Sequence, residues 1–246
     1  LAATRAAAME YGVPISIHLS ESPFEVQYSK DTYGDTSINL LESIGFFEGP
    51  TIAAHVVWPT EEEIPTLAKR KIGVIHNPTS NMKIASGIAP ITDMLAAGVR
   101  VGLGTDGAAS NNDLDMWEEM RLASLLQKVD RMNPEALSAT TVLTMATRGG
   151  ATAIGLGDSI GSLEVGKRAD VIQVEFDDVH HVPTYDVVSH LVWVSDEQDV
   201  ASVVVDGKVL MHEGKMLTID TDRVASEARA FAARIQAALQ ERNRPQ

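Results

Sequence analysis

The chain has 246 residues and a formal net charge of −14, and hydrophobic residues make up 44% of it, enough for a large domain with a core. A negative field of this size repels phosphates and anionic lipids, so we expect neither a nucleic acid polymer nor a membrane as partner. The absence of cysteine excludes disulfides, thiolate metal ligands and a cysteine nucleophile. A small-molecule substrate and a cytoplasmic location are compatible with these properties.

Residues 1–17 have the pattern of an amphipathic helix followed by a strand, which is not the pattern of a signal peptide. No apolar run in the sequence reaches the length of a membrane span. Because the chain opens with Leu1 in the middle of a helix pattern, we expect it to be the C-terminal portion of a longer protein.

Four short apolar runs each end in a polar residue that can take part in chemistry. The runs cover residues 12–18, 51–55, 71–76 and 99–106, and they end at His18, His55, His76 and Asp106. Continuous apolar character is typical of strands buried on both faces of a parallel sheet. The segments between them, residues 37–47, 61–70 and 88–99, fit helices, so the order predicts repeating strand–helix units.

The pattern of apolar and polar residues changes in the second half of the chain. Residues 114–129 and 133–155 predict two further helices, the second beginning at Asn133 and Pro134. Residues 160–175 and 200–219 are short β runs with glycine turn signals, which predict a small β-sheet domain. Residues 222–243 predict an alanine-rich amphipathic helix at the C-terminus.

The four strand-end residues form a candidate metal site, because a (β/α)₈ barrel aims the carboxyl ends of its strands into one mouth. A single strand-end histidine is more often structural, but four polar residues in corresponding positions favour a site. His18 and Asp106 suit ligation of a hydrolytic metal, and His55 suits either ligation or orientation of its water. Glu21, just after the first strand, is placed to carry protons. For Glu25, on the following helix, we favour a solvated surface charge.

The glycines of the VGLGTDGAASNN stretch have a second interpretation. Gly102, Gly104 and Gly107 match the G-x-G-x-x-G spacing of dinucleotide-binding proteins, which would make the chain a nicotinamide-dependent oxidoreductase. That fingerprint normally follows the first strand of its domain, whereas here three similar strands precede it. We therefore favour the interpretation that these glycines let the backbone pass close to a metal and substrate.

Five strings of the sequence resemble the amidohydrolase superfamily, most closely its methylthioadenosine/S-adenosylhomocysteine deaminase and chlorohydrolase-like branch. They are HLSES, AAH, HNPTSNMKIASGIAP, GTDGAASNND and IGSLEVGKRADVI. The resemblance implies an α/β fold: the C-terminal half of a (β/α)₈ TIM-like barrel with an appended small β-sheet domain and a C-terminal helix. It assigns residues 1–157 to barrel strands 5–8, residues 158–220 to a flanking β-sandwich part and residues 221–246 to the helix.

The resemblance also implies an activity and residue roles. It implies a metal-dependent hydrolytic deaminase of amino-substituted aromatic heterocycles, with methylthioadenosine- or S-adenosylhomocysteine-type adenosine derivatives as leading substrates. His18 and Asp106 would be metal ligands, and Glu21 would protonate the ring nitrogen. His55 would hydrogen-bond the metal-activated hydroxide. The cofactor would be one divalent ion, with Zn²⁺ ahead of Fe²⁺ and Ni²⁺, all of which suit His/Asp ligation.

One departure from the family pattern concerns the metal ligands. The family's first barrel strand carries an H-x-H pair, and none of the seven histidines here forms one. We expect the missing N-terminal half to supply that pair, and family habit suggests a homo-oligomer. The alternatives that stay open are a triazine- or guanine-type amidohydrolase or chlorohydrolase, and a barrel scaffold that lacks a complete metal site.

Further residues are candidates for contact with the substrate at the barrel mouth: His76, Trp58, Ser110 and Asn111. For Ser110 and Asn111, a role in a turn or a helix cap is equally open. For His76, a structural role is equally open. For Trp58, packing in the core is the favoured interpretation.

Two further segments have structural interpretations. Residues 80–83 would overhang the mouth of the barrel or form a simple turn. The pair His180–His181 is best interpreted as part of a surface loop.

Overall fold

The computed structural model describes residues 1–242, which form two compact units. The first unit takes residues 1–167 and 176–197, and the second takes residues 168–175 and the chain from Gln198 onward. This grouping differs from the predicted division at residues 157 and 220 mainly in the segment 176–197. That segment joins the first unit because its helix α11 (Val187–Trp193) packs on α8 and α9.

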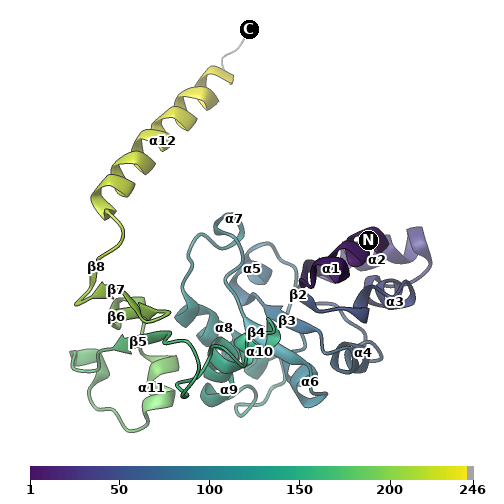
Figure 1. Cartoon of the computed structure of the whole chain (residues 1–246), viewed down its shortest axis with the longest axis horizontal. Coiled ribbons are helices and arrows are strands. Elements are labelled where there is room, and N and C mark those ends of the chain that lie inside the picture. Colours follow the sequence, from purple (N-terminus) through teal and green to yellow (C-terminus); the bar gives the residue numbers. More distant parts are fainter. Residues whose placement is uncertain (243–246) are drawn as a thin grey trace. The chain divides into compact units, whose positions relative to one another are not determined.

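A four-stranded parallel sheet forms the centre of the first unit (Figure 1). Its strands are β1 (Ile15–Leu19), β2 (Thr51–His55), β3 (Gly73–His76) and β4 (Arg100–Leu103). They lie in the order β1-β2-β3-β4, so each strand pairs in parallel with the next one along the chain. A doubly wound dinucleotide fold reverses its strand order at a switch point, whereas sequential order is how a barrel is wound. The predicted α/β barrel half is confirmed.

Short helices connect the strands, and most carry the end signals that the sequence offers. Ser22 caps α2 with Pro23 in its first turn, Gly34 ends it at a φ of 82°, and Asp115 caps α8. The helices of this unit are α1 (Ala2–Tyr11), α2 (Pro23–Tyr33), α3 (Ser37–Ser43), α4 (Ile64–Lys69), α5 (Pro78–Lys83), α6 (Ile91–Ala96), α7 (Ala108–Asn111), α8 (Met116–Asp130), α9 (Ala139–Thr144), α10 (Gly150–Ala153) and α11, with short 3₁₀ turns at Phe46–Glu48, Val179–His181 and Glu197–Asp199.

The core of the first unit lies where the apolar side chains of the strands meet these helices. It includes Val74 and Val101 of the sheet and Leu67 and Met94 of the helices, all of them buried. The close approach of α10 to the sheet depends on glycine: a Cβ on Gly73 would lie 1.8 Å from the carbonyl oxygen of Ala153. Glycine at the start of β3 is therefore required for this packing.

The helix predicted over residues 133–155 is wrong in its start and its continuity. Its first turn begins at Ala139, where the Ser138 side chain accepts a hydrogen bond from the Thr141 N–H, so Asn133 and Pro134 do not cap it. A π-helical segment, Met145–Gly149, follows, and the helix is interrupted at Thr147, whose φ of −121° and ψ of −107° are not helical. Two adjacent glycines, Gly149 and Gly150, follow the break and let α10 run against β4.

The second unit contains an antiparallel sheet with strand order β5-β6-β7-β8 and the helix α12 (Thr221–Arg242). The strands are β5 (Val171–Val174), β6 (Val200–Val205), β7 (Lys208–His212) and β8 (Lys215–Met216). Asp206–Gly207 and Glu213–Gly214 have positive φ at both residues, as two-residue hairpin turns require. The small β-sheet part is thus confirmed, whereas the second layer of a sandwich stays a prediction. Residues 243–246, the end of the predicted C-terminal helix, lie outside the described residues.

Candidate metal centre

Three side chains converge at the carboxyl edge of the parallel sheet. His18 lies near the end of β1, His55 ends β2, and Asp106 follows β4 by three residues. One ligand atom from each lies within 4.8 Å of the other two, and the two imidazole rings stack with their centroids 5.3 Å apart. An ion with ligands at about 2 Å bridges such a set after small side-chain rotations. Two imidazole nitrogens and a carboxylate oxygen are donors that suit a divalent transition metal.

The backbone at these positions is unusual for residues other than glycine. His55 has a φ of 73° and Asp106 a φ of 61°, both in the left-handed region. Such conformations are unfavourable for side chains with a Cβ and persist where the surrounding structure enforces them. The chain therefore turns abruptly at His55, the last residue of β2, and at Asp106, three residues after β4.

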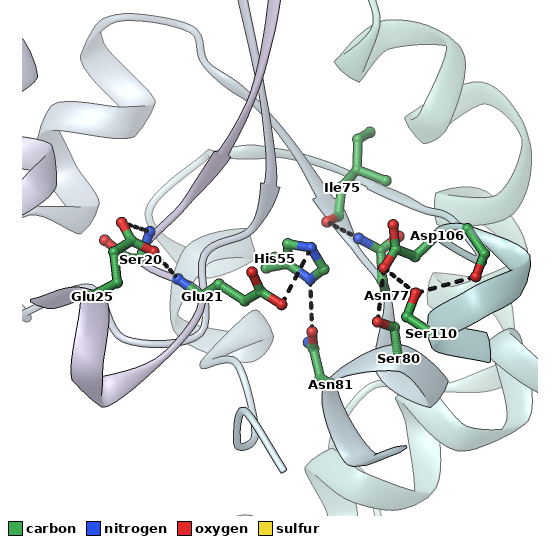
Figure 2. Close-up of polar contacts among 11 residues, drawn as sticks. Ser20, Glu21, Glu25, His55, Ile75, Asn77, Ser80, Asn81, Asp106 and Ser110 are labelled. Atoms are coloured by element: carbon green, nitrogen blue, oxygen red, sulfur yellow. Dashed lines mark hydrogen bonds and ion pairs between the residues drawn. The ribbon is translucent and has the colours of Figure 1, made fainter. Parts of the chain in front are cut away.

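His55 is nearly fully buried, at 1% exposed, and is contacted from two sides (Figure 2). Its Nδ1 lies 2.8 Å from Oδ1 of Asn81 on α5. Its Nε2 lies 3.9 Å from Oε1 of Glu21, whose side chain is 27% exposed. A partly exposed carboxylate thus lies beside the imidazole at the carboxyl edge of the parallel sheet.

The backbone of Glu21 is held in place by Glu25, for which a solvated surface charge is the expectation. That interpretation is wrong. The Glu25 carboxylate accepts hydrogen bonds from the backbone N–H groups of Ser20 and Glu21 and from the hydroxyl of Ser37, each at 2.8 Å. The spacing of Ser22 and Glu25, three residues apart at the start of α2, is the capping-box signal that could have revealed this role.

The carboxylate of Asp106 is oriented by two hydroxyl groups. Ser80 Oγ and Ser110 Oγ donate to its Oδ2 at 2.8 and 2.6 Å. Burial alone would raise the pKa of Asp106, but these bonds and the N–H of Gly107 outweigh burial and lower the pKa. Asp106 is therefore ionised at neutral pH, as a metal ligand must be.

A buried carboxylate, Glu119 on α8, connects the helix α5, which carries Ser80, with Asn111 at the end of α7. Its oxygens accept from the Thr79 N–H at 3.1 Å and from the amide of Asn111 at 2.7 Å, and Asn111 also donates to the carbonyl of Thr105. Burial raises the pKa of Glu119, although the bonds from Thr79 and Asn111 oppose this effect. Asn111 is thus buried and bonded within the chain, which fits the structural role left open by the sequence, and its contact with a substrate stays a prediction.

His76 and Trp58 differ in exposure. His76 is fully buried, and neither ring nitrogen has a hydrogen-bond partner among residues 1–242, so the structural role left open by the sequence fits its burial and its contact with a substrate stays a prediction. Burial, together with the nearby His55, lowers the pKa of His76 to about 3, so the ring is neutral. Trp58 is 45% exposed, so the favoured core packing is wrong; its Nε1 donates to the Ser86 carbonyl at 2.6 Å.

The remaining sequence candidates have structural roles. Gly104 leaves room for Asn77, whose Oδ1 would lie 2.7 Å from an added Cβ, so this glycine serves packing within the chain. Residues 80–83 belong to the helix α5 and not to a simple turn. His181 is buried and stacks on Phe176 with ring centroids 4.6 Å apart, so it does not belong to an exposed loop.

A parallel sheet that gathers imidazoles and a carboxylate at the carboxyl ends of its strands is the construction of metal-dependent barrel enzymes. Residues 1–210 match the amidohydrolase family. The chain belongs to this family, as its motifs predicted.

Known proteins of this family resemble the chain over almost its full length. A 5-methylthioadenosine/S-adenosylhomocysteine deaminase from Desulforudis audaxviator is 52% identical over 230 residues, 94% of this chain and 54% of that protein. An adenosine deaminase from Xanthomonas campestris, solved with bound zinc, has a TM-score of 0.93 at 37% identity, covering 96% of this chain and 54% of its own. The zinc complex of the atrazine chlorohydrolase TrzN from Arthrobacter aurescens TC1 has a TM-score of 0.85 at 34% identity, covering 92% and 50%. The chain thus spans about half the length of the relatives it matches.

Proposed function

We propose that this chain supplies strands 5–8 of the catalytic barrel of a metal-dependent deaminase acting on amino-substituted aromatic heterocycles, with adenosine derivatives as substrates. The convergence of His18, His55 and Asp106 within 4.8 Å, with Glu21 beside His55, is the observation that carries this proposal. The names of the deaminase relatives support the substrate class. Residues 158–220 and 221–246 would form the flanking β part and the terminal helix.

The donor set of the site fits a divalent cation, and we propose zinc. His18 and Asp106 would hold it, with ligation by His55 as the alternative to the orienting role described below. Further ligands would come from outside this chain. When bound, the cation supplies a water nucleophile that is active near neutral pH. The Ser80 and Ser110 hydroxyls occupy one oxygen of Asp106, and the other oxygen remains for the cation.

Glu21 and His55 would move and orient the groups that react. His55 Nε2 would accept a hydrogen bond from the attacking water and direct its oxygen at the ring carbon that carries the amine. Glu21 would pass one proton of that water to the adjacent ring nitrogen and the other to the leaving amine. The carbon–oxygen bond forms, the carbon–nitrogen bond breaks, and ammonia leaves, so that water replaces the amine as a carbonyl oxygen.

The experiment that tests this proposal is Glu21→Gln in the full-length protein, with ammonia release from methylthioadenosine and metal content as readouts. We expect turnover to fall by about 10² to 10⁴-fold, the usual contribution of a proton-transfer group, while metal content stays near that of the wild type. Glu10→Gln, the same exchange on an exposed residue of α1, is the matched control and keeps its activity. Undiminished turnover by the Glu21 variant would refute the assignment.

A second candidate is removal of chloride from a triazine, which the likeness to TrzN favours. Assaying chloride and ammonia release side by side, over chloro- and amino-substituted heterocycles, separates the two activities. The predicted homo-oligomer and cytoplasmic location stay predictions. Within the described part of the chain, no helix has the length and apolar character needed to cross a bilayer.

A further inference from the structure

The helix α5 places two adjacent residues against two different site groups (Figure 2). Ser80 and Asn81 are 0% and 1% exposed. Ser80 donates to the Asp106 carboxylate that follows β4, and Asn81 contacts the His55 imidazole at the end of β2. The short helix α5, which follows β3, therefore contacts a site residue at the end of β2 and another that follows β4.

The contact between Asn81 and His55 determines where the imidazole carries its proton. The atom of Asn81 that faces the ring is the amide oxygen Oδ1, 2.8 Å from Nδ1. An amide oxygen only accepts hydrogen bonds, so Nδ1 carries the hydrogen and a neutral ring leaves the lone pair on Nε2. In the opposite tautomer Nε2 would be a donor and could neither ligate a cation nor accept a hydrogen bond from water.

The other half of the Asn81 amide forms no hydrogen bond in the described part of the chain. Its Nδ2 is buried and has no hydrogen-bond partner within residues 1–242. An unpaired buried donor is unfavourable, so the nitrogen gives no reason for an amide side chain at this position. The oxygen, bonded to His55, is the part of the side chain that the site uses.

The position of α5 is itself fixed from outside the site. The short helix lacks a side-chain cap at Asn77, and the Thr79 N–H in its first turn donates instead to the buried carboxylate of Glu119, at 3.1 Å. A carboxylate at the start of a helix satisfies a free N–H group and interacts favourably with the helix dipole. The acceptor presented by Asn81 is therefore held at a defined place next to His55.

We infer that Asn81 is a positioning residue that fixes the tautomer and ring orientation of His55, so that Nε2 presents its lone pair to the reaction centre. This inference deepens the proposed function and rests on it for the role of Nε2. The geometry predicts that the oxygen of Asn81 is required and that its NH₂ group is dispensable.

Two substitutions, one that keeps an acceptor oxygen and one that removes it, test this role in the full-length, metal-loaded protein. Asn81→Asp keeps an oxygen facing Nδ1, and Asn81→Leu removes it. We expect Asn81→Leu to lower kcat by about 10- to 100-fold with little change in KM, the usual effect of removing a hydrogen-bond partner of a site histidine. Asn81→Asp is expected to stay within about threefold of the wild type. Asn39→Leu, at an exposed position of α3, is the control and keeps the wild-type kcat.

The second readout does not depend on turnover. With ¹⁵N-labelled histidine, NMR reports which ring nitrogen carries hydrogen, and the His55 signals are assigned by their loss in His55→Gln. We expect a protonated Nδ1 in the wild type and in Asn81→Asp, and a changed proton distribution in Asn81→Leu. If no heterocycle is turned over, this readout still decides the inference while the proposed function fails.

The opposite pattern would overturn the inference. Wild-type kcat in Asn81→Leu, or the same His55 tautomer in every variant, would show that Asn81 has a role in packing alone. An unprotonated Nδ1 in the wild type would be equally contrary. Should Asn81→Leu fail to fold, Asn81→Ala removes the acceptor without adding apolar bulk, and the same two outcomes apply to it.

Discussion

The buried carboxylate of Glu119 offers a quantitative test of how the site loops are held. We consider Glu119→Gln, which keeps the size of the side chain and removes its charge. The carboxylate accepts from two donors, the Thr79 N–H and the Asn111 amide. Glutamine has one acceptor oxygen and one donor nitrogen, so after the exchange one of the two donors faces another donor.

The expected loss of stability follows from these contacts. A hydrogen bond to a charged group contributes about 1.5–3 kcal/mol, and a buried donor left without a partner costs about 1–3 kcal/mol. Removing the charge recovers part of the burial penalty, which is visible in the raised pKa of Glu119. We therefore expect Glu119→Gln to lower the free energy of unfolding by about 2 kcal/mol.

The assay is urea unfolding of the full-length protein, with the midpoint and slope measured for each variant. Glu118→Gln is the matched control, because Glu118 precedes Glu119 on the same helix but is partly exposed. We expect that control to stay within about 0.5 kcal/mol of the wild type. A Glu119 variant as stable as the Glu118 variant would refute the claim that this carboxylate holds α5 and α7 in place.

Two further predictions concern stability. Because His76 is buried and neutral with a pKa of about 3, the folded state binds fewer protons than the unfolded state, and stability falls as the pH drops below about 6.5. The free energy of unfolding of the wild type should fall by about 2 kcal/mol between pH 6.5 and pH 5 because of His76, and His76→Gln should remove this contribution. The urea midpoints of the variant at the two pH values should then lie closer together than those of the wild type. An unchanged difference between the midpoints would contradict the buried neutral ring. Gly73→Ala would place a Cβ 1.8 Å from the Ala153 carbonyl oxygen, so we expect about 3 kcal/mol of destabilisation in thermal and urea unfolding. Gly107→Ala meets no atom within 4 Å in the described structure and should be nearly neutral, and equal effects at the two glycines would contradict the packing argument.

The strands and their chemistry were predictable because both follow from local patterns. Apolar runs that end in His18, His55 and Asp106 showed strand type and strand ends, and parallel winding then required these residues to share one edge. The break at Thr147 was not predictable in this way, because the apolar spacing continues through it. The break depends on how closely the backbone of α10 approaches β4, and the spacing of apolar residues in the sequence does not indicate this distance.

The supporting residues of the site were harder to predict than its candidate ligands. Asn81 lies in a helix of six residues, too short to show a period, and its partner His55 is 26 positions away along the chain. Glu119 did carry a signal, since it shares the buried stripe of α8 with Met120 and Ala123. A charge on an apolar stripe marks a carboxylate with buried partners, but those partners follow only from the tertiary fold.

The left-handed backbone at His55 and Asp106 has a consequence for engineering. Glycine would relieve about 1–3 kcal/mol of conformational strain at such positions, yet it offers neither an imidazole nor a carboxylate. Selection for heat resistance alone would thus reward the loss of these two side chains and yield robust but inert proteins. Directed evolution of this chain therefore has to select for turnover as well as for thermal stability, because the two properties favour different residues at these two positions.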